Sequence, residues 1–338
     1  MPASPHHGAM TRPLDLPPHL LERPFAVAEA WQEGVPPSTV RRTALTAPFY
    51  GVRRRASVPV TLRSQCAAAM CVLPASSVFS HGTAARLLGL PLPRGTADLP
   101  QTVEVTVPRR TTRPRGEGIR GHRSDLLAHE VVDLDGLAAT SPIRTWCDLA
   151  TRWSLDDLVM VGDAVVAGER DDDVVGLRLG GCRPAPRSPH RALPLPSPAD
   201  LRAAAVAWGA RRGSRSLRAA GDLVRTGVDS PPETHLRLLI VRAGLPEPVV
   251  NLDVHDSDGT WIHRPDLSWP RWRVGMDYDG GHHFSGSQAR VRRDASRRED
   301  LRSIGWLLPV VAGSDLYRRA LIVVRRARQA LLDHGATW

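Results

Sequence analysis

The C-terminal third of the chain shows the most regular alternation of apolar and polar positions. A helical period with Leu236, Leu239 and Ile240 on one face ends at Gly244. Three strand-like runs follow, and then a polar helical segment, an apolar strand and a last helix. The predicted elements are a helix over 231–243, strands over 249–254, 261–267 and 273–278, a helix over 288–304, a strand over 306–312 and a helix over 315–333. This succession predicts an α/β domain over residues 229–338.

The first part of the chain predicts a small helical unit that ends in a hairpin. Residues 1–22 are expected to form a flexible leader, and a first helix should stop at Gly34. Ser38 is expected to cap a second helix. Along this helix lie Val40, Arg41, Arg42 and Leu45. Residues 49–55 then resemble a wing, which predicts a winged helix-turn-helix DNA-binding domain over 23–62, although any small helical hairpin can show this pattern.

The segments between these two regions predict further helices and a linker. The expected elements are helices over 64–73 and 82–90, a strand over 102–107 and two helices within 141–169. Clustered aspartates, glycines and prolines then indicate a segment that forms no packed element. The expected order is a helical middle domain over 63–170, a linker over 171–198 and a helical connector over 199–228. The expected fold class is therefore a multidomain α/β protein.

The charge distribution points to a polyanionic partner. All 45 basic residues are arginine, and the net charge is +10. Residues 1–127 hold 16 arginines against 8 acidic residues, a net charge of +8, so a DNA-binding surface is expected in this third. A solvated connector is the alternative for the arginines that follow the strand over 102–107. The arginines expected to contact DNA are Arg41, Arg42, Arg53, Arg54, Arg55, Arg109 and Arg110.

The cysteines and the apolar runs argue against a secreted or membrane-spanning protein. The four cysteines form no CxxC pair, which indicates reduced thiols in a cytoplasmic protein. No apolar run reaches the roughly 20 residues of a transmembrane helix. The segment Met1–Arg12 lacks the apolar core of a signal peptide. We therefore expect a cytoplasmic location and no membrane partner.

Carboxylates gather at the strand ends of the predicted C-terminal domain. Asp266 lies at the end of one predicted strand, Asp277 ends the next, and Glu233 lies on the first helix. Carboxylate oxygens on adjacent strands bind Mg²⁺ and leave positions for water and phosphate. Two of the acidic positions have structural alternatives. Glu233 lies three residues after Ser230 and can complete a capping box, and Asp279 precedes a glycine, as is typical of a hairpin turn.

An ordered series of motifs in this domain resembles the PD-(D/E)xK restriction-endonuclease-like superfamily. Within it, the chain is similar to domains related to very-short-patch mismatch-repair endonucleases. The matching residues are Ser230–Thr234, Gly244–Pro246, Pro265-Asp266, Asp277–Gly280, His283-Phe284, Asp294, Arg297, Leu301 and Gly305-Trp306. The resemblance implies a restriction-endonuclease-like fold and a metal-dependent endonuclease that hydrolyses DNA.

The same resemblance implies roles for individual residues. Asp266 and Asp277 would bind Mg²⁺ or Mn²⁺, and His283 would act as the base. The further catalytic residue that it implies is Glu233, and the supporting residues are Asp279, Asp294 and Arg297. The chain departs from the family in two ways. The superfamily lysine falls at Asp279 in a chain without lysine, and Pro309 replaces a common polar residue.

Residues 25–170 resemble a second family, the AbiEi-like antitoxins of type IV toxin–antitoxin systems. The residues that carry this resemblance are Tyr50–Val52, Ser80–Ala85, Leu87–Pro91, Thr140–Pro142 and Asp148–Ala150. Members of that family bind their own promoter DNA and counteract a nucleotidyltransferase toxin. The resemblance therefore implies DNA and such a toxin as partners. His81, which follows Ser80 at a helix start, is interpreted as structural.

Two functions stay open at this point. The first is a DNA-binding protein that hydrolyses phosphodiester bonds through residues 229–338. The alternative is an AbiEi-like antitoxin or transcriptional regulator whose nuclease fold is catalytically degenerate. Asp266, Asp277 and His283 favour the first function, whereas the missing lysine and Pro309 favour the second.

Overall fold

The structure is a computed structural model that describes residues 15–96, 102–167, 195–280 and 288–338. The chain divides into two compact units, one of residues 1–88 and 95–141 and the other of residues 89–94 and 142–338. Both units combine helices with β-sheets, so the expected α/β class is confirmed. Among the described residues, no helix is both long and apolar enough to cross a membrane.

The first unit begins with three short helices and a three-stranded sheet. In chain order the elements are α1 (Pro18–Glu22), β1 (Phe25–Ala26), α2 (Val27–Gln32), α3 (Pro37–Val40), β2 (Leu45–Thr46) and β3 (Val52–Arg55), and the strands are ordered β1-β3-β2. Apolar side chains of α1, β1, α2, α3 and β2 share one buried cluster, which includes Phe25 and Val40. Leu16 and Leu20 belong to the same cluster, so the predicted flexible leader over 1–22 is wrong for its last residues.

The second predicted helix is shorter than expected. Its counterpart α3 starts with a proline, which is tolerated in the first turn, and ends at Val40. Ser38 therefore lies inside the helix and not at its cap, and Arg41 closes it. Leu45 belongs to β2 instead of the helix. Gly34, with φ at 79°, follows α2 as the predicted stop.

The rest of the first unit is built around a six-stranded sheet. Its elements are α4 (Leu62–Met70), β4 (Val78–Phe79), α5 (His81–Leu87), β5 (Val103–Val107), β6 (Arg115–Gly116), β7 (Ile119–Arg123), β8 (Val131–Asp133) and β9 (Ala138–Thr140), with the strands ordered β6-β7-β5-β4-β9-β8. The predicted helices near 64–73 and 82–90 and the strand near 102–107 are confirmed. The prediction of a helical middle domain is wrong. Four of the six strands, β4, β6, β8 and β9, span two or three residues and carry too little alternation to be seen in a sequence.

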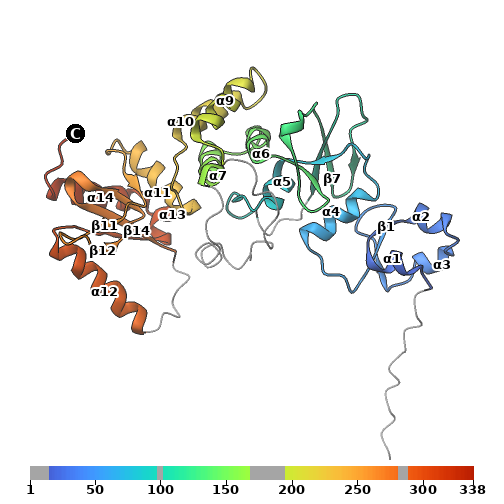
Figure 1. The fold of residues 1–338 in the computed structure, drawn as a ribbon, viewed down its shortest axis with the longest axis horizontal. Coiled ribbons are helices and arrows are strands. Elements are labelled where there is room, and N and C mark those ends of the chain that lie inside the picture. Colours follow the sequence, from blue (N-terminus) through green and yellow to red (C-terminus); the bar gives the residue numbers. More distant parts are fainter. Residues whose placement is uncertain (1–14, 97–101, 168–194, 281–287) are drawn as a thin grey trace, which may run out of the picture. The chain divides into compact units, whose positions relative to one another are not determined.

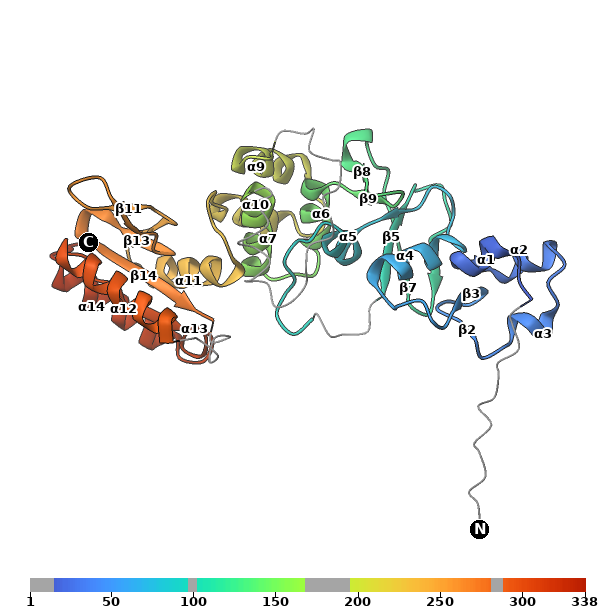
Figure 2. The same cartoon turned by 60° about the horizontal axis from the view of Figure 1, so that its bottom comes forward.

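Before its C-terminal domain, the described part of the second unit contains four helices. They are α6 (Pro142–Leu149), α7 (Leu155–Ala167), α9 (Pro198–Ala207) and α10 (Ser214–Leu223), and they gather together in both views (Figures 1 and 2). The buried indole of Trp146 donates a hydrogen bond to the carbonyl of Leu158 at 2.9 Å. Ser197 and Asp200 form a capping box at the start of α9. These contacts join α6 to α7 and stabilise the start of α9.

The division between the units differs from the predicted domain boundaries. The sequence pattern places the helices over 142–167 in a middle domain, whereas they share a unit with the C-terminal domain. The carboxylate of Asp163 on α7 explains this, because it accepts hydrogen bonds from the backbone N–H of Arg225 and the hydroxyl of Thr234, each at 2.8 Å. Most of the predicted linker over 171–198 lies outside the described residues.

The C-terminal domain has a central sheet of four strands in the order β10-β13-β14-β15. The strands are β10 (Val249–Val250), β13 (Leu267–Trp269), β14 (Val274–Asp279) and β15 (Val310–Ala312). Neighbours are antiparallel except β14 and β15, which are parallel. A separate ribbon is formed by β11 (Val254–His255) and β12 (Trp261–His263). The helices are α11 (Pro231–Arg242), α12 (Gln288–Ser303), α13 (Gly313–Arg318) and α14 (Ala320–Asp333).

Three predicted elements of this domain are interrupted. The predicted strand over 249–254 breaks at Asn251, whose φ of 50° is left-handed. The predicted strand over 261–267 breaks at Pro265, which cannot donate a ladder hydrogen bond. The last predicted helix is divided at Arg319, which ends α13 and precedes α14. The order of helix, strands, helix, strand and helix is otherwise confirmed.

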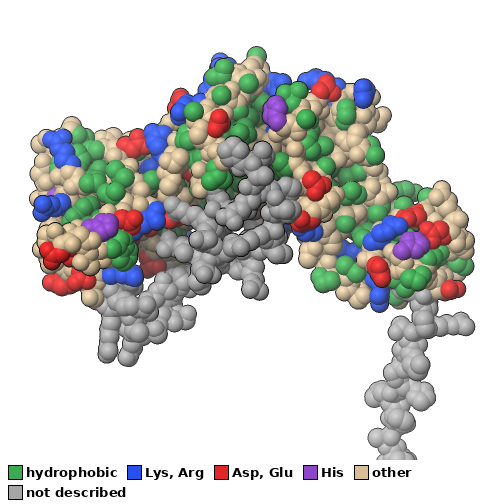
Figure 3. Space-filling model, viewed as in Figure 1, with side chains coloured by type: hydrophobic (Ala, Val, Ile, Leu, Met, Phe, Trp, Pro, Cys, Tyr) green, Lys and Arg blue, Asp and Glu red, His purple; other side chains and the backbone are tan. Residues whose placement is uncertain are grey.

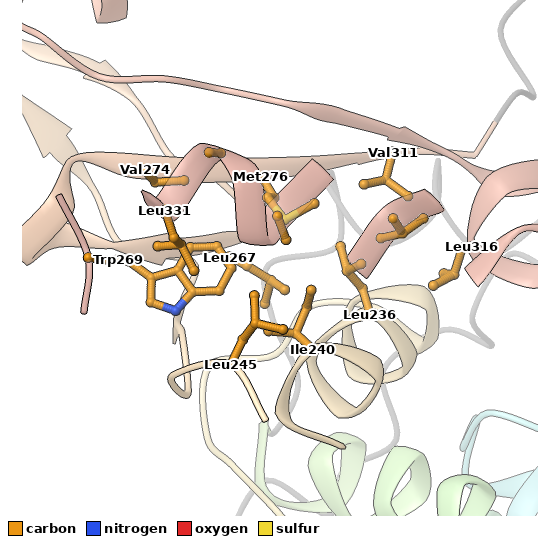
Figure 4. Close-up of a cluster of buried hydrophobic side chains, with 14 residues drawn as sticks. Leu236, Ile240, Leu245, Leu267, Trp269, Val274, Met276, Val311, Leu316 and Leu331 are labelled. Carbon is orange, nitrogen blue, oxygen red and sulfur yellow. The ribbon is translucent and has the colours of Figure 1, made fainter. Parts of the chain in front are cut away.

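The core of this domain lies between helices α11 and α14 and one face of the sheet. Figure 4 shows Leu236 and Ile240 of α11 in the same cluster as Met276 of β14. Successive residues of a strand point to opposite faces, so Tyr278 shares the face of Met276, and Asp277 points to the other face. The end of β14 therefore presents a different side chain on each side of the sheet.

Candidate active site

Asp266 directly precedes β13 and lies opposite Asp277 of β14. The register of β13 and β14 pairs Leu267 with Met276, which places Asp266 across from Asp277. Residues directly opposite each other in an antiparallel pair have Cβ atoms about 4.5–5.5 Å apart. Asp266 is buried and Asp277 is half-buried. The structure thus brings together the two residues that the family resemblance implies as metal ligands.

Both carboxylates have protein partners. Oδ2 of Asp266 accepts a hydrogen bond from the backbone N–H of Tyr278 at 2.7 Å, and Oδ1 of Asp277 accepts one from the backbone N–H of Asp266 at 3.4 Å. Two like charges opposite each other destabilise a sheet unless a cation or a proton compensates them. Two carboxylates on one face form a donor set that fits Mg²⁺ or Mn²⁺.

The imidazole beside this pair belongs to His263, which is not among the site residues predicted from the sequence. Its Nε2 lies 2.8 Å from Oδ2 of Asp277, and its side chain is 14% exposed. An imidazole that bonds a ligating carboxylate fixes the orientation of that carboxylate. The available signal was a histidine three residues before Asp266 at the end of a predicted strand. That spacing alone does not reveal the fold of the ribbon that brings His263 to Asp277.

Glu233 is held by other partners. Its carboxylate accepts hydrogen bonds from the backbone N–H of Asp229 at 2.9 Å and from the hydroxyl of Ser230 at 2.7 Å. The hydroxyl of Ser230 thus donates to Glu233, and it makes no hydrogen bond that caps the helix. The predicted capping box is therefore wrong in its details, although Glu233 does stabilise the start of α11.

One residue connects Glu233 to the carboxylate pair. The side-chain amide of Asn251 donates to Oε2 of Glu233 at 2.7 Å, and its backbone N–H donates to the carbonyl of Asp266 at 3.0 Å. A carboxylate that holds Asn251 in this way positions the segment that leads into Asp266. The geometry favours a supporting role for Glu233 over direct contact with a substrate.

The remaining predicted site residues are not brought into this pair. His283 lies outside the described residues. Asp279 ends β14, is exposed, and is in register with Ala312 of β15. Asp294 and Arg297 both belong to α12, where Arg297 is exposed. Of the predicted catalytic set, the structure therefore assembles Asp266 and Asp277, with Glu233 behind them.

A different group of residues also has the spacing of metal ligands. Among the described residues, His19, Glu29 and Glu33 are the one set of three whose ligand atoms lie within 4.8 Å of one another. Nε2 of His19 lies 3.0 Å from Glu33. Glu29 already accepts hydrogen bonds from Arg23, which lower the pKa of its carboxyl. Because Arg23 already compensates the charge of Glu29, the spacing of these groups does not by itself assign a metal site.

The arginines predicted to bind DNA fall into two groups. Arg54 is buried, and its Nη1 donates to the hydroxyl of Ser64 at 2.9 Å, so its assignment to DNA contact is wrong. Arg53 is half-buried and donates through Nε to the carbonyl of Val40 at 2.8 Å, which anchors the end of α3. On the face drawn in Figure 3, acidic and basic side chains are interspersed. The exposed members of the predicted set are Arg41, Arg55, Arg109 and Arg110, and Arg42 is half-buried.

Comparisons with known proteins leave the family undetermined. No family model matches the chain, and no solved structure matches it. The chain is similar to two uncharacterized proteins of Mycobacterium tuberculosis, one from strain CDC 1551 / Oshkosh and one from strain ATCC 25618 / H37Rv. Each is 29% identical over 111 residues, which cover 32% of this chain. The match spans only 40% of the length of each relative.

Proposed function

We propose that this protein binds DNA and hydrolyses its phosphodiester bonds at Asp266 and Asp277 with Mg²⁺ or Mn²⁺ as cofactor. The observation that carries the proposal is the cross-strand pair of these two carboxylates, with His263 against one of them. The succession of α11, antiparallel strands, α12 and a parallel strand agrees with a restriction-endonuclease-like domain. This agreement supports the resemblance of the C-terminal domain to restriction endonucleases that the sequence motifs imply.

The residues at this edge of the sheet have separable roles in the proposed reaction. Asp266 and Asp277 would hold the cation, which polarises the phosphate and makes hydroxide available near neutral pH. The backbone N–H of Tyr278 fixes one oxygen of Asp266, and His263 fixes one oxygen of Asp277. Arginine does not deprotonate and the chain has no lysine, so a nitrogen base here must be an imidazole. Within the described residues, His263 is the imidazole that contacts the carboxylate pair.

The first unit supports the DNA-binding part of the proposal. Its helix, turn, helix and strand-pair order is that of the expected winged helix-turn-helix. Arg41 closes α3 and Arg55 lies in β3, and both are exposed. Exposed arginines on a helix end and a wing can reach phosphate groups and position a duplex.

A cleavage assay tests the proposed function. Full-length protein is incubated with duplex, nicked, mismatched and single-stranded DNA in Mg²⁺ or Mn²⁺, with excess EDTA as the control. We expect cleavage of at least one of these DNAs that EDTA abolishes. His263→Gln should slow the reaction, whereas His255→Gln, an exposed histidine on the other strand of the same ribbon, should leave the rate unchanged. Cleavage that survives EDTA, or no cleavage of any DNA in either metal, would refute the proposal.

A second candidate function is a DNA-binding regulator whose nuclease fold only binds. His263 contacts Asp277 without a metal between them, and Asp279 stands where the superfamily has lysine. In that case the protein should retard DNA in a gel equally with and without divalent cations. A cytoplasmic location and a nucleotidyltransferase toxin as partner stay predictions of the sequence resemblance.

A further inference from the structure

A cavity lies at the end of β14, within the second unit. Its volume is about 710 Å³, and Arg94, His235, Tyr278, Gly313 and Tyr317 are among the residues that line it. A smaller cavity of about 290 Å³ shares Arg94, His235 and Tyr317 with it. Ligand pockets in proteins typically measure about 300–1,000 Å³. The larger cavity therefore has the size of a small-molecule site.

Two tyrosines form the aromatic part of this cavity. Tyr317 keeps 37% of its surface exposed, so a ligand can reach its ring. Burial raises the pKa of Tyr317 to about 12, so its hydroxyl stays protonated at neutral pH. Nδ1 of His235 lies 3.4 Å from the hydroxyl of Tyr317, and burial lowers the pKa of this imidazole. The cavity thus offers flat rings and neutral hydrogen-bonding groups.

Arg94 supplies the positive charge. Its guanidinium lies over the ring of Tyr317. No carboxylate in the described part of the chain forms an ion pair with Arg94. An arginine held on an aromatic ring presents N–H donors in a fork that matches phosphate. Asp279 also lines the cavity, so an anionic group is expected on the side of Arg94.

Gly313 keeps the space around Tyr278 open. A Cβ atom at this position would lie 2.9 Å from the hydroxyl of Tyr278, so an alanine would push that ring aside. Tyr278 follows Asp277 directly and points to the opposite face of the sheet. The cavity and the carboxylate pair therefore meet at the same strand end from two sides.

We propose that this cavity binds one nucleotide unit, with the base stacked on the Arg94–Tyr317 pair and Tyr278 and with the phosphate bonded to Arg94. Unpaired bases stack on aromatic rings and on guanidinium planes, and such a stack accepts any base. The nucleotide is either a free mononucleotide or an unpaired nucleotide of a bound strand. The inference rests on the proposed function to explain why nucleic acid would be present at this strand end. Its test measures binding and does not require cleavage.

The test measures binding and not cleavage. Full-length protein is titrated by calorimetry with dAMP, with a short single-stranded oligonucleotide and with inorganic phosphate. The pocket variants are Tyr317→Leu and Arg94→Gln. The matched controls are Trp338→Leu and Arg328→Gln, because this second arginine–aromatic pair lies outside the cavity, with 5.8 Å between guanidinium and ring. Gly313→Ala provides a third pocket variant that removes no ligand-binding group.

We expect saturable binding of dAMP or of the strand, weakened about tenfold or more by each pocket variant and by neither control. If dAMP binds, a free mononucleotide is sufficient to occupy the cavity. If the oligonucleotide binds but dAMP does not, the occupant is an unpaired nucleotide of a strand. The inference is overturned if neither probe binds, if phosphate alone binds as tightly as dAMP, or if pocket and control variants behave alike. Asp277→Asn should abolish cleavage and retain nucleotide binding. A wild-type protein that binds through the pocket but never cleaves would refute the proposed function alone.

Discussion

Replacing Arg237 should strongly destabilise the second unit, because it leaves a buried carboxylate without its charged partner. The side chains of Arg237 and Asp163 are each 1% exposed, and Nη2 lies 3.2 Å from Oδ2. The same Nη2 donates to the carbonyl of Leu223 at 2.8 Å. The pair thus joins α7 and the end of α10 to α11, whose first turn carries Glu233.

The expected magnitude follows from the burial of both partners. Removing one member of a buried ion pair costs about 3–5 kcal/mol, whereas replacing both members by apolar residues is often neutral. We expect Arg237→Met to lower the free energy of unfolding by about 3–5 kcal/mol, and the double variant with Asp163→Leu to cost less than the two single changes together. Urea unfolding of the full chain, followed by circular dichroism, measures all four proteins. A loss below about 1 kcal/mol in Arg237→Met, or strict additivity, would refute this reasoning.

The same pair predicts a pH dependence of stability. Burial raises the pKa of Asp163 from 3.8 to about 6, while Arg237 opposes this rise. The folded state therefore holds this proton more tightly than the unfolded state. The resulting stabilisation is fully present below about pH 4 and is lost as pH rises through about 6, and it amounts to about 3 kcal/mol. The stability advantage of the wild type over Asp163→Asn should shrink by up to that amount from pH 4 to 7, and a constant difference would contradict the assignment.

Two further predictions concern residues whose roles the structure separates. Asn251→Ala should cost about 2–4 kcal/mol in urea unfolding, because it removes the hydrogen bond to Glu233 and puts alanine at positive φ, and Asn251→Gly should cost about 1 kcal/mol less. Equal losses of unfolding free energy in Asn251→Ala and Asn251→Gly would show that the positive φ of residue 251 does not affect stability. Arg54→Ala should destabilise the first unit by about 1–3 kcal/mol, whereas Arg55→Ala should leave stability unchanged and reduce the salt dependence of DNA binding by about one phosphate contact. The opposite assignment of these two effects would show that Arg54, not Arg55, faces DNA.

Elements with strong local signals could be predicted from the sequence. The helix over 231–243 is confirmed to within one residue as α11, because prolines mark its start and Gly244 follows its end. The end of β14 at Asp279 is similarly close to its prediction. Short strands could not be predicted, because β2, β4 and β6 span two residues each and carry no alternation.

The candidate site could be predicted only in part. Asp266 and Asp277 could be predicted because the two strands beside which they lie are consecutive in the central sheet and form an antiparallel pair. His263 could not be predicted, because its contact with Asp277 depends on how the ribbon of β11 and β12 folds against β14. The burial of Arg54 could have been predicted from the sequence, since Arg54 shares the inward face of its strand with Val52.

The central claim is that Asp266 and Asp277 together hold a cation that drives hydrolysis. The most direct measurement is the single-turnover cleavage rate of the best DNA substrate in Mn²⁺ for wild type, Asp266→Asn, Asp277→Asn and Asp258→Asn. Asp258 is an exposed aspartate in the turn between β11 and β12 and serves as the matched control. We expect each site variant to lose at least about a hundredfold in rate with DNA binding retained, and the control to match the wild type. Wild-type rates in both site variants would contradict the claim.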